Sequence, residues 1–468
     1  MSNQQDTPLK DEARPLKAYR KLRNHAAWFF FCSDSYRIWT HHYLSHEYHA
    51  RFRPDSCPES YPEHMAVSLA SGARIRDVYE FAYRHNVVVV GGSAEDVGIA
   101  GWLTGGGHGP LTSLFGQGSD NIMQATIVTP NGDVVTANAC QNADLFWAIR
   151  GGGGGTFGIL THVTMKAYPS PSAATHRLEV VANGPDDGAT FWKAVAGVFS
   201  LLPHLKSKGF AGNIFLDRPP YVPKLALHWT LNFLTPESSM DTTHAAERVL
   251  EPLQLYLDTQ SPHISYNSKL SFYPSWFQSW NHTVHTEPHA VGAFGVAMAS
   301  RLIPAASLDN TTGFLELTLQ SVSESVTGFQ AHLAMYEPSL SSSQGPTAEE
   351  LRKTSLPPHW RTAVLQLFTV TTFPDYATAA EKMTVFEHVT NGPGKLIKQL
   401  APDGGSYINE DDPFNPDWQR DFFGSQDNYE SLRRVKNQVD HDGQLWCVSC
   451  VGSEAWTEDE SGRLCRVA

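Results

Sequence analysis

The residues of this sequence best suited to ligand binding lie in two glycine-rich segments, residues 91–121 and residues 144–160. Glycine reaches positive φ and lets backbone N–H groups approach a ligand with no Cβ in the way. The glycine runs at 105–107 and 151–155 carry an entropic cost that a plain scaffold avoids. Aromatic and aliphatic residues flank both runs, which excludes a flexible linker. Two alternatives remain, a bound anion or nucleotide and the close packing of backbone on backbone.

Neither standard phosphate-binding motif accounts for these segments. A P-loop ends in Gly-Lys followed by Ser or Thr, and no Lys follows either glycine run. A Rossmann fingerprint follows a strand and opens a helix, but residues 101–106 do not match G-x-G-x-x-G. Residues 153–158 match it and lead into the strand-like sequence TFGILTHVTMK, which is the wrong context. The glycine segments therefore indicate a dinucleotide that is not held in the Rossmann manner.

Clusters of histidine and cysteine raise the alternative of a metal site. A zinc site needs three or four convergent ligands supported by further hydrogen bonds. The strand expected around His41 and His42 would place these neighbours on opposite faces. Cys447 and Cys450, in the sequence CVSC, have no evident second Cys or His pair, so ordinary buried thiols are favoured. No metal site is predicted, and the histidine clusters considered are His41, His42, His46 and His49, and His282, His285 and His289.

The order of elements around the glycine segments indicates a lobe that mixes helices and strands. Apolar residues at helical spacing are followed by a short continuous apolar run, which is typical of a buried strand. The sequence Pro-Asn-Gly at 130–132, between two alternating stretches, predicts a β-hairpin. The expected elements are strands at 65–69, 87–90 and 156–166, helices at 74–85 and 144–150, and the hairpin at 122–136.

The middle of the chain has a different pattern. Alternating hydrophobicity at residues 225–234 and 363–372 predicts antiparallel strands of a half-exposed sheet. Helices are expected between the strands, at residues 189–202 and 379–400. The aromatic stretch FYPSWFQSW, residues 272–280, either lines a substrate site or packs in the core.

The composition limits the classes of function. A chain of 468 residues with 41% hydrophobic and 18% charged residues is globular and long enough for two or three domains. The formal net charge of -13 disfavours nucleic acid as a partner, because an acidic surface repels phosphate. The apolar run at residues 26–32 is far shorter than a membrane span, and no secretory signal is visible. Neither nucleic acid nor a membrane is expected as a partner, and the compartment stays open.

Three motif blocks, in order along the chain, resemble one family of flavin enzymes. The first is GGGH followed by P-L and by G-x-x-x-D-N, at residues 105–121. The second is DLFWAIRGGGGGTFG, at residues 144–158, and the third begins with YINE at residues 407–410 and continues to Trp456. Together they resemble the FAD-linked oxidases related to vanillyl-alcohol oxidase and berberine bridge enzyme. The resemblance covers the chain from about residue 38 to residue 456.

This resemblance implies an α+β fold with two lobes. A PCMH-type FAD-binding lobe is expected to face a substrate lobe built on an antiparallel sheet, and the C-terminal segment is expected to return to the FAD lobe. The domains expected are a divergent or truncated N-terminus at 1–37, a partial FAD-binding domain at 38–171, a substrate-binding α+β domain at 172–400 and a C-terminal berberine-bridge-like segment at 401–468.

The resemblance also implies FAD as the cofactor and a small organic molecule as the substrate. Such enzymes oxidise an alcohol, an amine or an activated C–H bond by hydride transfer to the flavin, and the protein orients the substrate. O2 is the expected electron acceptor, and secondary metabolism is the expected setting. A non-catalytic relic of the fold and a cyclase with little FAD are the alternatives. The residues expected to contact the cofactor are Gly91, Gly92, Gly98, Gly101, Gly105, Gly106, Gly107, His108, Asp120, Asn121, Ile159 and Asn409.

The sequence departs from the family pattern in two places. The family has an N-terminal sub-lobe with a Gly-Gly-His loop whose His is often bonded to the flavin, and no such loop precedes residue 39. A truncated or mis-spliced reading is favoured over a true loss, and His25 lies near the distance expected of the linking residue. Ala94 stands where some relatives have a second covalent anchor, a Cys. Glu95 and Asp96 replace a Pro-Thr pair and would repel a nearby diphosphate unless they point away.

Hydride transfer from an alcohol or amine usually needs a base that takes the remaining proton. Glu410 follows the Tyr-x-Asn motif, where relatives place a residue that faces the substrate. Its carboxylate would act as the base if burial raised its pKa, but the run Glu410, Asp411 and Asp412 favours a solvated acid. Tyr407 and Tyr429 are the other catalytic candidates, although a buried tyrosine more often serves packing.

Overall fold

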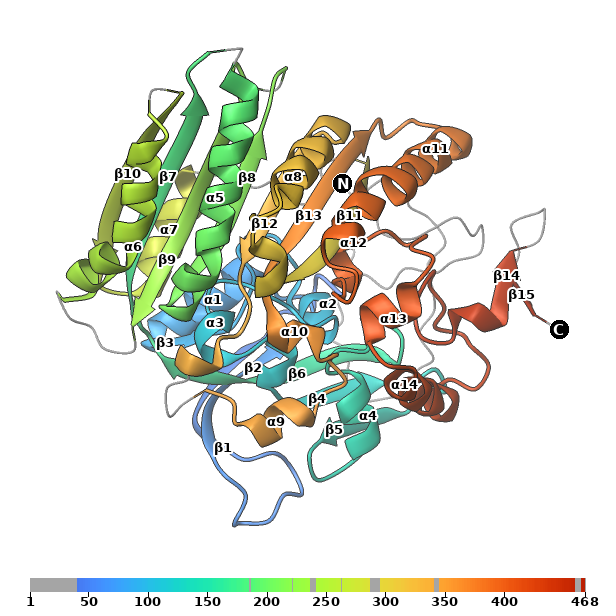
Figure 1. Ribbon diagram of the computed structural model, residues 1–468. Coiled ribbons are helices and arrows are strands. Elements are labelled where there is room, and N and C mark those ends of the chain that lie inside the picture. Colours follow the sequence, from blue (N-terminus) through green and yellow to red (C-terminus); the bar gives the residue numbers. More distant parts are fainter. Residues whose placement is uncertain are drawn as a thin grey trace, which may run out of the picture.

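The computed structural model describes residues 40–184, 187–220, 222–235, 241–261, 263–286, 295–340, 345–458 and 464–467. Figure 1 shows the two large sheets of this part of the chain in separate layers. We call residues 40–171 the N-terminal lobe, residues 172–400 the sheet lobe and residues 401–467 the C-terminal segment. The division follows the two sheets and agrees with the expected α+β fold.

The N-terminal lobe is built on a sheet with the strand order β1-β2-β6-β4-β5, and β3 pairs with β6. All of its strand pairs are antiparallel. The strands are β1 (His46–Phe52), β2 (His64–Ala70), β3 (Val87–Val89), β4 (Ile122–Val128), β5 (Val134–Asn138) and β6 (Ile159–Pro169). The helices are α1 (Ile75–Arg84), α2 (Ile99–Thr104), α3 (Thr112–Phe115) and α4 (Ala143–Ala148), with the 3-10 turn η1 (Gly118–Asn121). These confirm the elements expected around the glycine segments.

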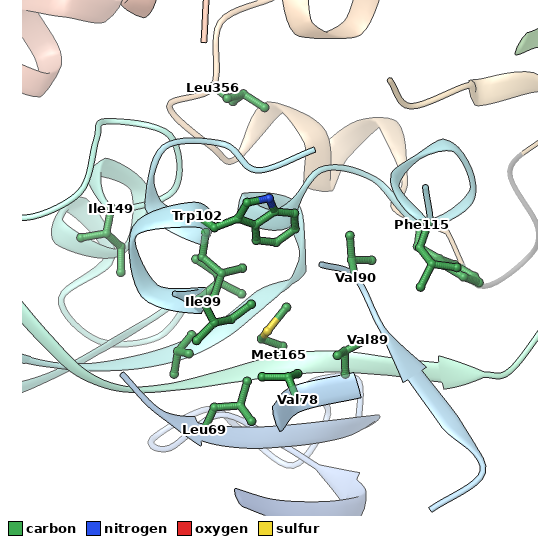
Figure 2. Packing of buried hydrophobic residues seen from close by; sticks show 14 of the residues in the cluster. Leu69, Val78, Val89, Val90, Ile99, Trp102, Phe115, Ile149, Met165 and Leu356 are labelled. Atoms are coloured by element: carbon green, nitrogen blue, oxygen red, sulfur yellow. The ribbon is translucent and has the colours of Figure 1, made fainter. Parts of the chain in front are cut away.

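Helix α1 and its neighbours form the core that fixes the glycine segments. Ile75, Val78, Tyr79 and Ala82 follow helical spacing and are buried, so α1 presents one apolar face to the sheet. The tryptophan of α2, Trp102, lies in the same cluster and is buried. Figure 2 shows the packing of residues from these elements, including Leu69, Val78, Val89, Val90, Ile99, Trp102 and Met165.

The sheet lobe carries a seven-stranded sheet in the order β10-β7-β9-β8-β12-β13-β11. Its pairs are antiparallel, as expected for residues 225–234 and 363–372. The strands are β7 (Ser172–Ala182), β8 (Phe210–Asp217), β9 (Ala226–Thr235), β10 (Ile264–Tyr273), β11 (Gly295–Pro304), β12 (Gly328–Leu333) and β13 (Ala363–Phe373). The helices are α5 (Gly188–Ser207), α6 (Asp241–Thr259), α7 (Trp276–Thr286), α8 (Phe314–Ser325), α9 (Ala348–Arg352) and α10 (His359–Thr362). The helix expected at 379–400 is α11 (Ala379–Val389), a π-helical turn (Thr390–Gly394) and α12 (Lys395–Leu400).

The two faces of this sheet differ. Leu365, Ala331, Ile214 and Trp229 point to one face and are buried in a cluster with residues of α5, α6 and α8, which lie along the sheet in Figure 1. The alternate residue Leu302 belongs instead to the hydrophobic cluster of the N-terminal lobe. Because side chains alternate along a strand, one face packs on helices and the other faces the N-terminal lobe.

The C-terminal segment packs against the N-terminal lobe. Its elements are η6 (Ile408–Glu410), α13 (Trp418–Phe423), α14 (Gln426–Val439), η7 (Ser453–Ala455), β14 (Trp456–Glu458) and β15 (Leu464–Arg466). The ammonium of Lys436 donates to the carbonyl of Thr156 at 2.8 Å, and Asn409 Nδ2 donates to the carbonyl of Gly101 at 3.0 Å. The buried side chains of Phe423 and Leu432 join the hydrophobic cluster of the N-terminal lobe.

Two expectations about local structure are wrong. Cys447 and Cys450 are not thiols, because they form a disulfide, and a second disulfide joins Cys57 to Cys140. His41 and His42 lie in a turn and not in a strand. Within the described ranges, we find no helix whose length and apolar character suit a membrane span.

Candidate functional site

A strip of bare backbone lies on α2 and the second glycine run. A Cβ built at Gly98, Gly101 or Gly155 would meet no other heavy atom within 4 Å. Gly98 precedes the first residue of α2 and Gly101 follows one turn later, so both lie on one face of the helix. A Cβ at Gly154 would lie 3.5 Å from the Cα of Gly101, which places the two glycine runs side by side. This glycine strip (Gly98, Gly101, Gly154 and Gly155) offers a flat ligand contact with backbone alone.

The glycine run at 105–107, in contrast, packs closely against other protein atoms. A Cβ at Gly105 would lie 2.5 Å from Nδ2 of Asn409, and one at Gly107 would lie 2.8 Å from the carbonyl oxygen of Trp102. Gly106 and Gly107 also have positive φ, at 121° and 70°. Close packing therefore accounts for the lack of side chains in this run, and the expected contact of Gly105, Gly106 and Gly107 with the cofactor stays a prediction.

Gly91 and Gly92 also pack closely against other protein atoms. A Cβ at Gly91 would lie 2.6 Å from the hydroxyl of Tyr79, and one at Gly92 would lie 3.2 Å from Nε1 of Trp102. The hydroxyl of Tyr79 donates to the carbonyl of Gly92 at 2.9 Å. These two glycines let α1 and α2 pack against the loop that follows β3.

Asp120 and Asn121 hold the first glycine segment in place through buried side chains. Arg361 of α10 donates twice to the Asp120 carboxylate, at 2.6 and 2.7 Å. The amide of Asn121 donates to the carbonyl of Gln117 at 2.8 Å and accepts from the hydroxyl of Tyr168 at 2.7 Å. Both side chains bond to protein groups and support the loop, and their expected contact with the cofactor stays a prediction.

The two carboxylates that replace the family's Pro-Thr pair are neutralised locally. Glu95 forms an ion pair with Arg76, and Asp96 forms one with Arg74 at 2.9 Å. Both arginines belong to α1 or its N-cap. The repulsion of a nearby diphosphate that the sequence raises is therefore offset by paired guanidinium groups.

Glu410 lies where the three parts of the chain meet. Its Oε2 is 3.1 Å from Nε2 of His108 in the N-terminal lobe and accepts a hydrogen bond from Nε2 of Gln366 in β13 at 3.1 Å. Nδ1 of His332 in β12 lies 3.9 Å from the same oxygen. The Glu410 side chain is 27% exposed, whereas those of His108 and His332 are 8% and 11% exposed. We call these four residues the Glu410 cluster.

The favoured interpretation of Glu410 as a solvated acid is wrong. Burial raises the pKa of the Glu410 carboxyl, but His108, His332 and Gln366 together outweigh that effect and lower it below its ordinary value. The next two residues, Asp411 and Asp412, are only 3% exposed each. The net pKa of the carboxyl is lowered, so the condition of a raised pKa is not met, and the carboxylate is ionised at neutral pH.

Tyr407 and Asn409 connect the Glu410 cluster to the glycine strip. The hydroxyl of Tyr407 accepts from Nδ2 of Asn409 at 2.8 Å, and its ring meets the ring of His108 edge-on, with centroids 5.3 Å apart. Burial raises the pKa of the Tyr407 hydroxyl well above its ordinary value, so it stays protonated. Because Asn409 also donates to Gly101, the strip and the cluster form one continuous site.

Tyr429 lies in other surroundings. Its buried hydroxyl donates to the Glu454 carboxylate at 2.5 Å and accepts from the backbone N–H of Gly452 at 3.1 Å. Its ring packs on Trp418 and Phe423 of α13. The structure therefore places Tyr429 in the packing of the C-terminal segment and not beside Glu410.

A row of polar side chains crosses the face of the large sheet that points to the N-terminal lobe. In the strand pairing, each residue of this row lies directly opposite the next one on the neighbouring strand, so all of their side chains share one face of the sheet. The hydroxyl of Ser93, just after the Gly-Gly of the N-terminal lobe, contacts Asn213 Oδ1 at 3.4 Å. The row runs through Gln366, His332, Asn213, Thr230 and Arg177.

Sequence reasoning missed His332 and Gln366. Each interrupts an apolar strand, in FQAHL and AVLQLF, and an isolated polar residue on such a strand was the available signal. Of the other candidates, Ile159 begins β6 and pairs with Val128. His25, the expected linking residue, lies outside the described residues, as does His289.

Two family descriptions match the parts of the chain that build this site. The family described as FAD binding domain matches residues 58–138, and the family described as berberine and berberine like matches residues 406–446. FAD-linked oxidoreductase apf9 of Gibberella fujikuroi is 32% identical over 430 residues, which is 88% of this chain and 69% of that protein. The chain belongs to the FAD-linked oxidoreductases. FAD-linked oxidoreductase easE of Arthroderma benhamiae is 31% identical and covers 92% of this chain, with 83% of that protein matched.

Solved structures place this oxidoreductase among the VAO-type flavoproteins. The crystal structure of MtVAO713 from Myceliophthora thermophila C1 superposes with a TM-score of 0.82 at 27% identity, over 92% of this chain and 74% of that chain. The glucooligosaccharide oxidase of Acremonium strictum has a TM-score of 0.64 at 19% identity, over 88% of this chain and 80% of that chain, and it shows the shared fold alone. The enzyme is thus a VAO-type flavoprotein, with FAD as its cofactor.

The residues present fit the ring system of FAD. The glycine strip supplies the cradle, because a Cβ at Gly98, Gly101 or Gly155 would occupy the space that a flat ring needs. Asn409 and Glu410 stand at the edge of that strip. The glycine strip and Asn409 are thus the residues that would hold the flavin in this oxidoreductase.

Proposed function

We propose that this FAD-linked oxidoreductase oxidises a small organic alcohol, amine or activated C–H bond, with Glu410 as the base and O2 as the electron acceptor. The observation that carries the proposal is the position of Glu410, an ionised carboxylate held between the two lobes next to the glycine strip. FAD, when bound, would supply the hydride acceptor for this reaction. From the family resemblance, we also propose a role in secondary metabolism.

The lowered pKa defines what Glu410 does. Because the carboxyl is ionised at neutral pH, its oxygen is ready to accept the proton of a substrate hydroxyl or amine. A lowered pKa also makes it a weaker base. Because an ionised carboxylate only accepts hydrogen bonds, Nε2 of His108, 3.1 Å away, donates to it and helps to hold the carboxylate in place. Gln366 donates to the same carboxylate and fixes its orientation.

The polar row supports a substrate that forms hydrogen bonds. Gln366, Asn213 and Thr230 are uncharged, and they lie on the sheet face that points to the N-terminal lobe. Buried polar groups of this kind reject a ligand that leaves them unpaired. We therefore propose a substrate with hydroxyl or carbonyl groups on the side that meets the sheet.

The test compares the native enzyme with Glu410→Gln, which keeps the shape and removes the base. Both proteins are loaded with FAD, and the rate of flavin bleaching is followed without oxygen for a panel of alcohols and amines. We expect the variant to bind FAD normally and to lose about 10²–10⁴-fold in the reduction rate, the usual contribution of a general base. Hydrogen peroxide formed on admission of air checks O2 as the acceptor. A variant that reduces flavin at the native rate excludes Glu410 as the base.

A further inference from the structure

Three potential metal-binding atoms meet at the Glu410 cluster. His108, His332 and Glu410 each offer one ligand atom, and these three atoms all lie within 4.8 Å of one another. The residues come from the N-terminal lobe, from β12 and from the C-terminal segment, and His108 and Glu410 are 302 positions apart. The fold, and no local motif, brings them together.

The distances suit a small divalent ion. Two donors that are each about 2.1 Å from a tetrahedral ion lie about 3.4 Å apart. Glu410 Oε2 is 3.1 Å from His108 Nε2 and 3.9 Å from His332 Nδ1, one separation on each side of that value, and the ligand atoms of the two histidines lie within 4.8 Å of each other. Rotation of the two imidazoles toward a common point would complete the geometry.

The donor set selects the type of ion. Two imidazole nitrogens and one carboxylate oxygen suit Zn²⁺ and other borderline metals, whereas Mg²⁺ and Ca²⁺ prefer oxygen ligands alone. One ionised carboxylate supplies a negative charge, and the shielded histidines raise the strength of each bond by excluding water.

Gln366 provides a fourth group at the same place. It is fully buried, and among the described residues its Oε1 has no hydrogen-bond partner, while its Nε2 donates to Glu410. Rotation of the amide exchanges these two atoms. An amide rotated in this way would turn its oxygen toward Glu410 Oε2, and a cation between the two oxygens would offset their repulsion.

We propose that His108, His332 and Glu410 form a Zn²⁺ site, and that an ion bound there stops Glu410 from accepting a proton. The binding of metal stands on the geometry alone, and the inhibition rests on the proposed function. The enzyme is therefore expected to be active without metal and blocked by zinc.

Calorimetry with the full-length, FAD-loaded protein, stripped of metal by a chelator, tests the binding. ZnCl2 is titrated into the native protein and into His332→Gln and Glu410→Gln, and MgCl2 serves as the metal control. His388→Gln changes an exposed histidine of α11 and is the matched control for zinc held elsewhere. We expect one site that is weakened by about tenfold or more in the two cluster variants, that is unchanged in His388→Gln, and that does not take Mg²⁺.

Co²⁺ gives a second measurement, because its visible absorbance reports the coordination geometry. A tetrahedral spectrum that is lost in His332→Gln supports the site. Thermal unfolding of each variant confirms that it is folded. The proposal is overturned if the native protein does not bind zinc, or if both cluster variants bind zinc as tightly as the native protein does.

The result also separates the two proposals. If zinc binds but Glu410→Gln reduces flavin at the native rate, the metal site stands and the inhibition falls with the proposed base. If Glu410→Gln is inactive and zinc does not bind, the base stands and the metal site is wrong. Zinc that binds at the cluster and leaves flavin reduction unchanged overturns the inhibitory role.

Discussion

The N-terminal lobe and the sheet lobe contribute different kinds of contact to the site. The N-terminal lobe offers backbone, in the glycine strip on α2 and beside it. The sheet lobe offers side chains, in a polar row whose members stand opposite one another on neighbouring strands. Backbone contacts leave a trace in the sequence as glycine runs, whereas the register of a sheet leaves none.

The glycines of the N-terminal lobe also fall into two groups, those open to a ligand and those packed closely against protein atoms. Gly101 and Gly107 are close in sequence and belong to the same motif block. A Cβ at Gly101 would meet no other heavy atom within 4 Å, whereas a Cβ at Gly107 would lie against Trp102. Glycine therefore serves two purposes in one segment, ligand contact and tight packing, and the predictions below separate them.

The largest effect on stability is expected for Asp120→Ala, which removes a buried carboxylate that pairs with the half-buried guanidinium of Arg361. Arg361 would lose both of its short hydrogen bonds to carboxylate, and breaking a buried pair costs about 3–5 kcal/mol. Denaturant unfolding measures the change, with the exposed Asp133→Ala of the hairpin as the control. Unchanged stability together with weaker FAD binding would restore the interpretation of Asp120 as a cofactor contact.

On the sheet lobe, the dependence of stability on pH is expected to come partly from His176 of β7. Burial lowers the pKa of His176 to about 4 from the ordinary 6.5, and its Nδ1 accepts from Nε1 of Trp229 at 3.0 Å. The unfolded chain therefore binds a proton that the folded chain rejects, so stability is complete above pH 6.5 and falls toward pH 4. The loss approaches about 3 kcal/mol.

The variant His176→Gln tests that assignment, since an amide does not titrate in this range. Unfolding free energies of both proteins are measured between pH 7 and pH 4, conditions that keep the ordinary histidine pKa of 6.5 inside the window. The slope for the variant should be shallower than that for the native protein. Parallel slopes would show that His176 does not contribute.

For the closed glycines, Gly107→Ala should destabilise the protein by about 2 kcal/mol, because the added Cβ meets the Trp102 carbonyl and the φ of 70° is unfavourable for alanine. Thermal unfolding measures the loss. The affinity of the folded fraction for FAD should change little. A variant as stable as the native protein would mean that the run at 105–107 is not held by packing.

The smallest change in stability is expected at the open position. Gly101→Ala adds a Cβ inside α2, where alanine favours the helix by about 0.5–1 kcal/mol, and it meets no protein atom. The same Cβ occupies the glycine strip, so FAD affinity should fall by about tenfold, which corresponds to about 1.4 kcal/mol. Fluorescence titration with FAD gives the affinity, and Gly132→Ala in the hairpin turn, also in open space, is the control for FAD binding. Normal FAD affinity of Gly101→Ala would show that the flavin does not lie against α2.

The sequence by itself determined the local elements and the family. Hydrophobic periodicity located α1, β3, the β4–β5 hairpin and β13, because each depends on contacts of near neighbours with one buried face. The three motif blocks identified a flavin enzyme, because glycine and a few aromatic residues are dictated by a close approach of backbone. Glu410 was a candidate for the same reason, since it adjoins the Tyr-x-Asn motif.

Only the tertiary structure decided the electrostatic state of Glu410 and its neighbours. The run of three acids looked solvated, yet Asp411 and Asp412 are buried and Glu410 is held by groups from two other parts of the chain. The pairing of His332 with Gln366 follows from strand register, which depends on the packing of the whole sheet. Charge, burial and metal-binding geometry are properties of long-range contacts, so no local pattern along the chain contains them.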